Sequence, residues 1–354
     1  MKHLIDCRGK EPGCLPGSVG RTVLALVLAT VLAWAPLPAA AEADARAMLR
    51  VPPQLAMEAL PGFASRASPT DTLAAGVPRP RAQASPLGPE QMRQRTWLVL
   101  GGSFLAVSAF AVRNGWADNL TGEFGTRSEG WFGGRTYAGG ADKFGHAFAG
   151  HAGTRLLASG LRWARHSREG ALRLAALSTF GVRLGVEILD GFERGHQFSW
   201  EDLAADAAGV GVGYLLESRP ELDALVDFRI QYWPSDARRR AGAFRARGGD
   251  NDGYTWLLAL KGSGVPALRD HPVLRYLELS IGYGTMGYDA ADGANQFGTR
   301  HIYYGISLNL SEVLNATVFR STPRAAPVRR ISETVLEYVQ MPGTALLADH
   351  RLEP

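Results

Sequence analysis

Ionisable residues interrupt three segments that otherwise have the composition of buried helices. Burying an unpaired charge costs on the order of several kcal/mol, so we expect these side chains to contact one another, a ligand or water. They are therefore the best candidates for a functional site, although they do not name a reaction. The candidates for a ligand-binding or structural polar cluster are Asp142, Lys143, His146, Glu187, Asp190, Asp202 and Asp206.

Helical spacing places pairs of these residues on common faces. Asp142 and His146 are four residues apart, so both lie on one side of a helix. Glu187 and Asp190 lie at the C-terminal end of an apolar helix, where carboxylates oppose the helix dipole. A locally unfavourable residue more often marks a site than a scaffold, which favours a functional role for Glu187. Histidine transfers protons near neutral pH, which makes His146 a candidate for catalysis. The carboxylates Glu187 and Asp206 are the other two candidates.

Each candidate also has a structural interpretation. Asp142 follows two glycines and an alanine, where a helix N-cap belongs, and capping can coexist with a site role. His146 equally fits a hydrogen-bonded histidine in a core or interface. A capping-box pattern explains Asp202, but it does not explain Asp206, which lies one turn further along a helix of Ala, Gly and Val. We therefore expect Asp206 to have a charged partner, and the candidates are His146, Lys143 and Arg183.

Sequence motifs identify neither a metal nor a cofactor. Carboxylate-bridged di-metal bundles use Glu-x-x-His, whereas His146 follows an aspartate by four residues and has no second histidine in a matching position. The sequence has no His-Glu-x-x-His, Gly-x-Ser-x-Gly, phosphate-loop or dinucleotide pattern. No metal site is therefore assigned, and any cofactor remains unknown.

The first 41 residues have the pattern of a secretory signal peptide. Basic residues precede an apolar run at 22–36, and Ala39-Ala40-Ala41 fits cleavage after Ala41; an uncleaved anchor is the alternative. Both cysteines, Cys7 and Cys14, precede the apolar run, so neither fits lipid attachment. The remaining chain has no thiol for a disulfide or a zinc site.

The net charge argues against nucleic acid as a partner. The formal charge is +4, and removing the four basic and two acidic residues of 1–41 lowers it to +2. The composition indicates five parts in order along the chain. These are a signal peptide (1–41), a disordered Ala/Pro-rich tether (42–88), a helical domain (89–233), a charged loop (234–253) and a β-meander region (254–345).

The predicted fold class is α+β, with a bundle of about four helices followed by a small antiparallel β-meander. The helices are expected at about 90–112, 142–165, 169–190 and 200–217. Within the first helix, the uncharged run 96–112 covers roughly 25 Å, just under the ~30 Å of a hydrocarbon core. That run fits a membrane helix or a buried core helix.

Strands are expected where apolar residues alternate with polar ones. The expected strands are 254–261, 275–283, 301–310 and, as a fourth, 336–340. Long alternating strands with aromatics resemble those of outer-membrane barrels, but four or five strands are too few, since closure takes about eight. We therefore expect a meander whose apolar face packs on the helices.

The chain resembles the YfiM-like family of predicted periplasmic lipoproteins, a domain of unknown function, over about 130–235. The resemblance rests on Asp142-Lys143-x-x-His146, Glu187-x-x-Asp190 and Ser199-Trp200-x-Asp202-Leu203-x-x-Asp206. A weaker similarity is to VanZ-like membrane proteins, which have Asn at the position of Asp206. The resemblance implies an exported protein of the periplasm or an envelope membrane, with a shared site and no known activity. Lipid anchoring does not carry over, because no cysteine follows the apolar run.

Two functions remain in competition. The favoured one is a non-enzymatic, membrane-associated envelope protein whose polar cluster is structural or binds a ligand or lipid head group. The alternative is a membrane-proximal hydrolase or transferase acting on a lipid or glycan. In that case His146 is the acid–base group, Glu187 a second carboxylate, and Asp202 with Asp206 holds the histidine or a divalent cation. A membrane surface or envelope lipid is the expected partner, and a protein partner or homo-oligomer is left open.

Overall fold

The computed structural model describes residues 88–113, 120, 123–193, 195, 197–240, 242, 249–288 and 298–353. The predicted signal peptide, and all but the last residue of the predicted tether, lie outside these residues. Both therefore stay predictions. The residues from 87 onward form one compact unit, and the fold below is that of this unit.

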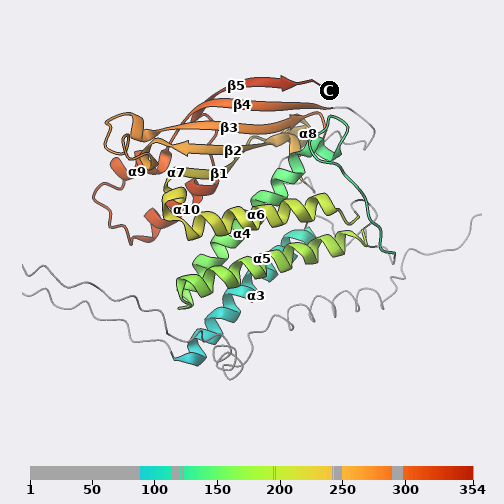
Figure 1. Cartoon of the computed structure of the whole chain (residues 1–354), viewed down its shortest axis with the longest axis horizontal. Coiled ribbons are helices and arrows are strands. Elements are labelled where there is room, and N and C mark those ends of the chain that lie inside the picture. Colours follow the sequence, from blue (N-terminus) through green and yellow to red (C-terminus); the bar gives the residue numbers. More distant parts are fainter. Residues whose placement is uncertain are drawn as a thin grey trace, which may run out of the picture. The chain divides into compact units, whose positions relative to one another are not determined.

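Four long helices confirm the predicted helical region (Figure 1). They are α3 (Pro89–Arg113), α4 (Ala141–Trp163), α5 (Arg168–Asp190) and α6 (Trp200–Ser218). Side-chain caps set the starts of α5 and α6: Ser167 accepts a hydrogen bond from the Gly170 amide, and Ser199 accepts one from the Asp202 amide. The capping box predicted at Ser199 therefore does cap its helix. The N-cap of α4 is Gly140, so the interpretation of Asp142 as an N-cap is wrong.

The helices α4 and α6 approach so closely that only glycine fits between them. A Cβ added to Gly209 would lie 1.9 Å from the carbonyl oxygen of Ala147, and one added to Gly213 would lie 2.7 Å from that of His151. On the facing helix, a Cβ added to Gly150 would lie 2.6 Å from the backbone carbonyl oxygen of Asp206. Because the two backbones are in contact, the charged side chains of α4 and α6 lie close enough to form hydrogen bonds and ion pairs with one another.

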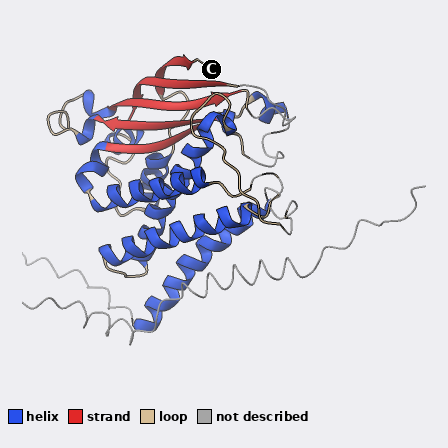
Figure 2. Cartoon of the chain, turned by 45° about the vertical axis from the view of Figure 1, so that its right-hand side comes forward, coloured by secondary structure: helices blue, strands red, loops and turns tan. Residues whose placement is uncertain are grey.

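A five-stranded antiparallel meander follows, which confirms the α+β class (Figure 2). Its strands pair in chain order, and they are β1 (Val226–Tyr232), β2 (Tyr254–Lys261), β3 (Leu277–Met286), β4 (Thr299–Leu308) and β5 (Ala345–Leu352). The strand β1 lies inside the range 89–233 that the sequence assigned to helices, and β5 extends past residue 345. Neither of these two strands was predicted.

The prediction of a strand at 336–340 is wrong, because α10 (Pro327–Tyr338) covers most of that range. A proline in the first helical turn favours a helix start there, and it outweighs the short alternation further along. The shorter elements of the described residues are α7 (Pro220–Leu225), α8 (Asp236–Arg240), α9 (Leu310–Ala316), η2 (Tyr137–Gly140), η3 (Asn251–Gly253), η4 (Gly262–Gly264) and η5 (Leu274–Tyr276).

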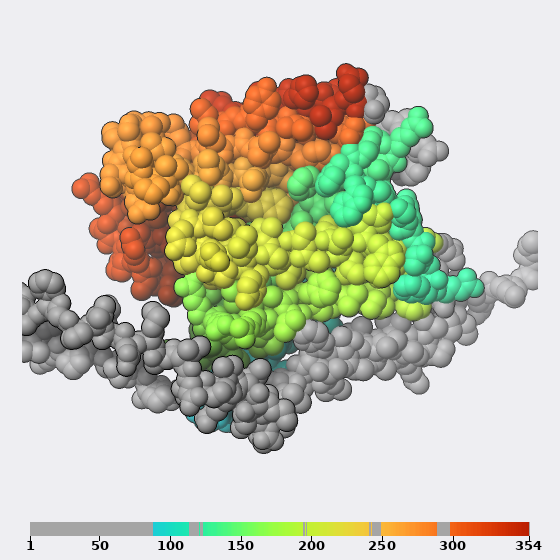
Figure 3. Space-filling view, viewed as in Figure 1, coloured from blue at the N-terminus to red at the C-terminus, as the bar shows by residue number. Residues whose placement is uncertain are grey.

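Aromatic side chains join α4 to the sheet. The ring centroids of Phe144 and Tyr283 are 5.1 Å apart, and those of Phe148 and Trp256 are 5.6 Å apart. Phe228 on β1 also packs on Phe148. Figure 3 shows the strands, in orange and red, directly against the green and yellow helices. The expected packing of the meander on the helices is thus observed at this end of the sheet.

Helix α3 is mostly exposed, which contradicts the buried-core interpretation of 96–112. Among the described residues it is the one helix long and apolar enough to cross a membrane, and 6% of its apolar window is buried. Leu98, Leu105 and Phe110 are each at least 67% exposed. Its contacts with the bundle include Val99, which lies against Gly160, and Thr96, whose hydroxyl is 2.8 Å from His166 Nε2.

Candidate functional site

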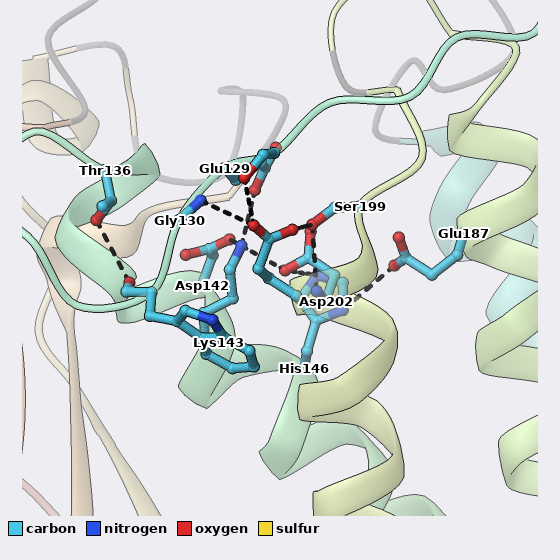
Figure 4. Close-up of polar contacts among 12 residues, drawn as sticks. Glu129, Gly130, Thr136, Asp142, Lys143, His146, Glu187, Ser199 and Asp202 are labelled. Carbon is cyan, nitrogen blue, oxygen red and sulfur yellow. Dashed lines mark hydrogen bonds and ion pairs between the residues drawn. The ribbon is translucent and has the colours of Figure 1, made fainter.

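Lys143 is the centre of the first half of the polar cluster (Figure 4). Its Nζ donates to Asp142 Oδ2 at 2.6 Å, to Asp202 Oδ1 at 2.6 Å and to Glu129 Oε2 at 2.8 Å. These three carboxylates come from α4, α6 and the loop before η2. An ammonium group has three protons, so all of its hydrogen-bond donors are used. The Lys143 side chain is 1% exposed.

His146 is the centre of the second half, one turn further along α4. Its Nδ1 lies 3.2 Å from Asp206 Oδ2 and 3.4 Å from Glu187 Oε1. Arg183 on α5 donates from Nε to Asp206 Oδ1 at 2.5 Å. Its Nη2 lies 2.8 Å from His146 Nδ1. The expectation that Asp206 has a charged partner is met by both Arg183 and His146.

The two halves adjoin through His146, whose Nε2 lies 3.8 Å from Asp202 Oδ1. The helices thus bring together six of the seven predicted residues. The seventh, Asp190, is near enough to Glu187 for its charge to raise the Glu187 pKa. Sequence analysis missed Glu129 as a member, because no periodic pattern in its Gly- and aromatic-rich loop links it to a helix.

One nitrogen of His146 has two incompatible neighbours. Nδ1 can accept from Arg183 Nη2 or donate to Asp206 Oδ2, and a ring nitrogen serves one of these at a time. Burial and Arg183 lower the pKa of His146, but the hydrogen bond to Asp206 and nearby carboxylates outweigh them, so the pKa is raised. Protonated His146 can only donate from Nδ1, so protonation favours the contact with Asp206 over the one with Arg183.

Protons offset part of an excess of buried negative charge. Five carboxyl groups, those of Glu129, Asp142, Glu187, Asp202 and Asp206, face two permanent cations, Lys143 and Arg183. Burial raises the pKa of Glu187 to about 8, and burial opposed by Lys143 raises the pKa of Asp142 to about 7. The pKa of Asp202 is lowered instead, because His146 and Lys143 outweigh the effect of burial.

Burial limits what chemistry the cluster can do. Glu187 is 1% exposed and Asp206 0%, whereas the side chains of His146 and Arg183 are 21% and 18% exposed. A histidine paired with a carboxylate can act as a general base when one ring nitrogen faces a substrate. Here Nδ1 faces Asp206 and Arg183, and Nε2 is 3.8 Å from Asp202.

Two groups of side chains converge as metal ligands do, but each already contains a cation. Glu129, Asp142 and Asp202 form one group, and the Lys143 ammonium sits among them. His146, Glu187 and Asp206 form the other, and the Arg183 guanidinium contacts two of its members. In this arrangement Lys143 and Arg183 supply the positive charge that a metal ion would bring.

We predict that Glu187→Gln makes the free energy of unfolding less dependent on pH. Between pH 4.5, the ordinary pKa, and about 8, the unfolded chain ionises Glu187 while the folded protein keeps the proton, so stability falls as pH rises. The variant should reduce that slope by up to about 1.4 kcal/mol per pH unit. Urea unfolding across this range measures it.

The matched control for that measurement is Glu169→Gln, at an exposed position of the same helix, where the side chain is 72% exposed. It should leave the slope unchanged. An unaltered slope in Glu187→Gln would show that the folded protein does not hold this proton.

The comparisons with known proteins identify a family for the segment that contains the cluster. Residues 128–218 match the family model described as a predicted periplasmic lipoprotein (DUF2279). No curated protein and no solved structure matches the chain. The match confirms the resemblance to predicted periplasmic lipoproteins, whereas it does not show the VanZ-like similarity. The matched residues 128–218 include every member of the polar cluster, and the match supports an exported protein that is periplasmic or membrane-associated in the cell envelope.

Proposed function

We propose that this chain is a non-enzymatic envelope protein whose helical domain is held together by the buried polar cluster and is kept at a membrane by α3. The observation that carries the proposal is Lys143, whose three donors join α4, α6 and the preceding loop through three buried carboxylates. A buried ammonium group whose three donors are all used fixes the positions of its partners, and buried polar networks of this kind rigidify and specify a fold.

The geometry favours a structural role over the alternative of a hydrolase or transferase. Catalysis by His146 would require a ring nitrogen that is free to take a proton from a substrate or water. Arg183 and Asp206 occupy Nδ1, and Glu187 holds its own proton up to a pKa of about 8. Of the candidate catalytic groups, His146 Nδ1 and Asp206 are thus engaged with each other and with Arg183.

The exposed apolar surface of α3 supports the membrane contact. At ~1.5 Å per residue, the 24 residues Pro89–Val112 span roughly 36 Å, enough to cross the ~30 Å hydrocarbon core. Large apolar side chains on this helix, among them Leu105 and Phe110, are exposed to solvent in the isolated chain. Burial of these side chains in lipid would remove the cost of hydrating them.

Replacing Asp206 tests the structural role. We expect Asp206→Asn to lower the free energy of unfolding by about 2 kcal/mol, because the Arg183 guanidinium and His146 lose a charged partner in a buried site. The control is Asp236→Asn, at a side chain that is 73% exposed, which should change stability little.

Chemical unfolding of both variants measures the difference. An Asp206→Asn protein as stable as the parent, with a defect in the envelope of cells that carry it, would contradict the structural role and favour a functional site.

A further inference from the structure

The sheet has an exposed apolar surface, which we name the apolar patch. It consists of Leu258 and Leu260 on β2, Leu279 and Ile281 on β3, Tyr304, Ile306 and Leu308 on β4, and Leu346 on β5. Strand register places these residues on one face. Leu258 pairs with Ile281, which pairs with Tyr304, and Leu260 pairs with Leu279 in the next row. The exposed fractions run from 39% at Leu260 to 86% at Leu346.

The packing of α4 covers a different part of the same face. Trp256 and Tyr283 lie on this face, two residues along their strands from Leu258 and Ile281, and both contact aromatic side chains of α4. The expectation that the meander packs its apolar face on the helices therefore fails for the apolar patch.

The opposite face of the sheet is buried, and it carries charged and hydroxyl groups beside Leu257 and Ala259. Arg229 on β1 donates to Glu278 on β3 at 2.6 Å and to Gln340 at 2.9 Å, and it is 3% exposed. Ser280 and Ser307, on neighbouring strands, are hydrogen-bonded to each other at 2.5 Å and are at most 5% exposed. Charged and hydroxyl groups thus occupy the side that water does not reach.

Chain connectivity shows that the sheet curls around this polar face. The Gln340 amide donates to Ile230 on β1, and the Leu308 amide on β4 donates to Thr344. Residue 340 therefore lies outside β1 and residue 344 lies outside β4, with the four strands β1 to β4 between them. In a flat sheet these two positions would be about 24 Å apart. Four residues of extended chain reach about 14 Å at most, so the strands must curve toward one another.

This polarity is the reverse of that of a water-soluble antiparallel sheet. Such a sheet buries its apolar face and exposes its polar face. Here the curled sheet encloses Arg229, Glu278 and Ser307 and presents leucine and isoleucine to the outside. Sheets with polar interiors and apolar exteriors are those that face lipid.

We propose that the apolar patch contacts the acyl chains of a lipid bilayer. From Leu277 to Tyr283 on β3 and from Tyr304 to Leu308 on β4, every position of this face is apolar or aromatic. A protein–protein interface carries polar groups and hydrogen bonds at its rim, whereas acyl chains offer none. Membrane association of the chain supplies the bilayer, and the proposal does not depend on the role of the polar cluster.

Cysteine labelling tests the contact at a single position. In the full chain with Cys7→Ser and Cys14→Ser, the variant Ile281→Cys has one thiol for an environment-sensitive fluorophore. We expect its emission to shift to shorter wavelength on phosphatidylethanolamine–phosphatidylglycerol vesicles and to be largely lost when the acyl chains carry doxyl quenchers. The control is Val328→Cys on α10, which is 58% exposed against 53% for Ile281, and it should show neither change.

Three outcomes overturn the proposal. A blue shift of the Ile281 label without vesicles, growing with protein concentration and insensitive to doxyl lipid, would identify a second copy of the chain as the occupant. An emission wavelength of the Ile281 label that does not change on vesicles would show that the apolar patch stays exposed to water. Equal quenching of the Val328 label would show that the contact is not confined to the patch. A label at Leu105→Cys reports α3 separately, so that failure of the α3 contact and failure of the patch are distinguishable.

Discussion

Replacing Lys143 by methionine is expected to lower the free energy of unfolding by about 3–5 kcal/mol. Methionine matches the length of the aliphatic stem but provides no charge and no donor. The carboxylates of Glu129, Asp142 and Asp202, each buried, would then face one another without the cation that all three contact. Urea unfolding monitored by circular dichroism measures the loss.

The exposed pair Arg173–Glu169 provides the control for that measurement. Its side chains are 66% and 72% exposed, so Arg173→Met should cost no more than about 0.5 kcal/mol. Asp142→Asn should cost less than Lys143→Met, because a carboxyl group with a pKa of about 7 is already partly protonated at neutral pH. Equal stability of Lys143→Met and the parent would contradict a structural cluster.

The long helices were predictable because their signals are local. Ser167 and Ser199 cap α5 and α6 through hydrogen bonds to residues three positions on, and Pro89 occupies the first turn of α3. The convergence of the cluster was predictable from the free-energy cost of burying an unpaired charge, because charged side chains inside apolar helices need partners. Glu129 was not, because its contact with Lys143 depends on the path of a loop.

The sheet shows where sequence patterns stop being sufficient. Alternation at 275–283 and 301–310 predicted β3 and β4, which lie at Leu277–Met286 and Thr299–Leu308, but alternation does not say which side of a strand meets protein. The apolar side was expected to be buried, whereas Leu279 and Ile306 are exposed and Glu278 is buried. That outcome depends on curling, which is fixed by hydrogen bonds of Gln340 and Thr344 far along the chain.

The close contact of α6 with α4 at Gly209 gives the second prediction with a large effect on stability, and Gly211 on the same helix provides the control. At Gly209 a new Cβ would lie 1.9 Å from the Ala147 oxygen, while at Gly211 no atom lies within 4 Å. We expect Gly209→Ala to destabilise the protein by about 3 kcal/mol, because α4 and α6 must move apart. Gly211→Ala should stabilise it by about 0.5–1 kcal/mol through helix propensity.

Separation of these helices should also disturb the polar cluster, because Lys143 and His146 are on α4 while Asp202 and Asp206 are on α6. NMR titration of His146 in the folded fraction of Gly209→Ala should give a pKa closer to the ordinary value of 6.5. The reason is that the hydrogen bond from His146 to Asp206, which raises this pKa, lengthens. A His146 pKa identical in Gly209→Ala and Gly211→Ala would mean that helix contact does not set the geometry of the cluster. The glycines and the charges would then be independent features of the fold, and the Lys143 contacts alone would have to hold α4 against α6.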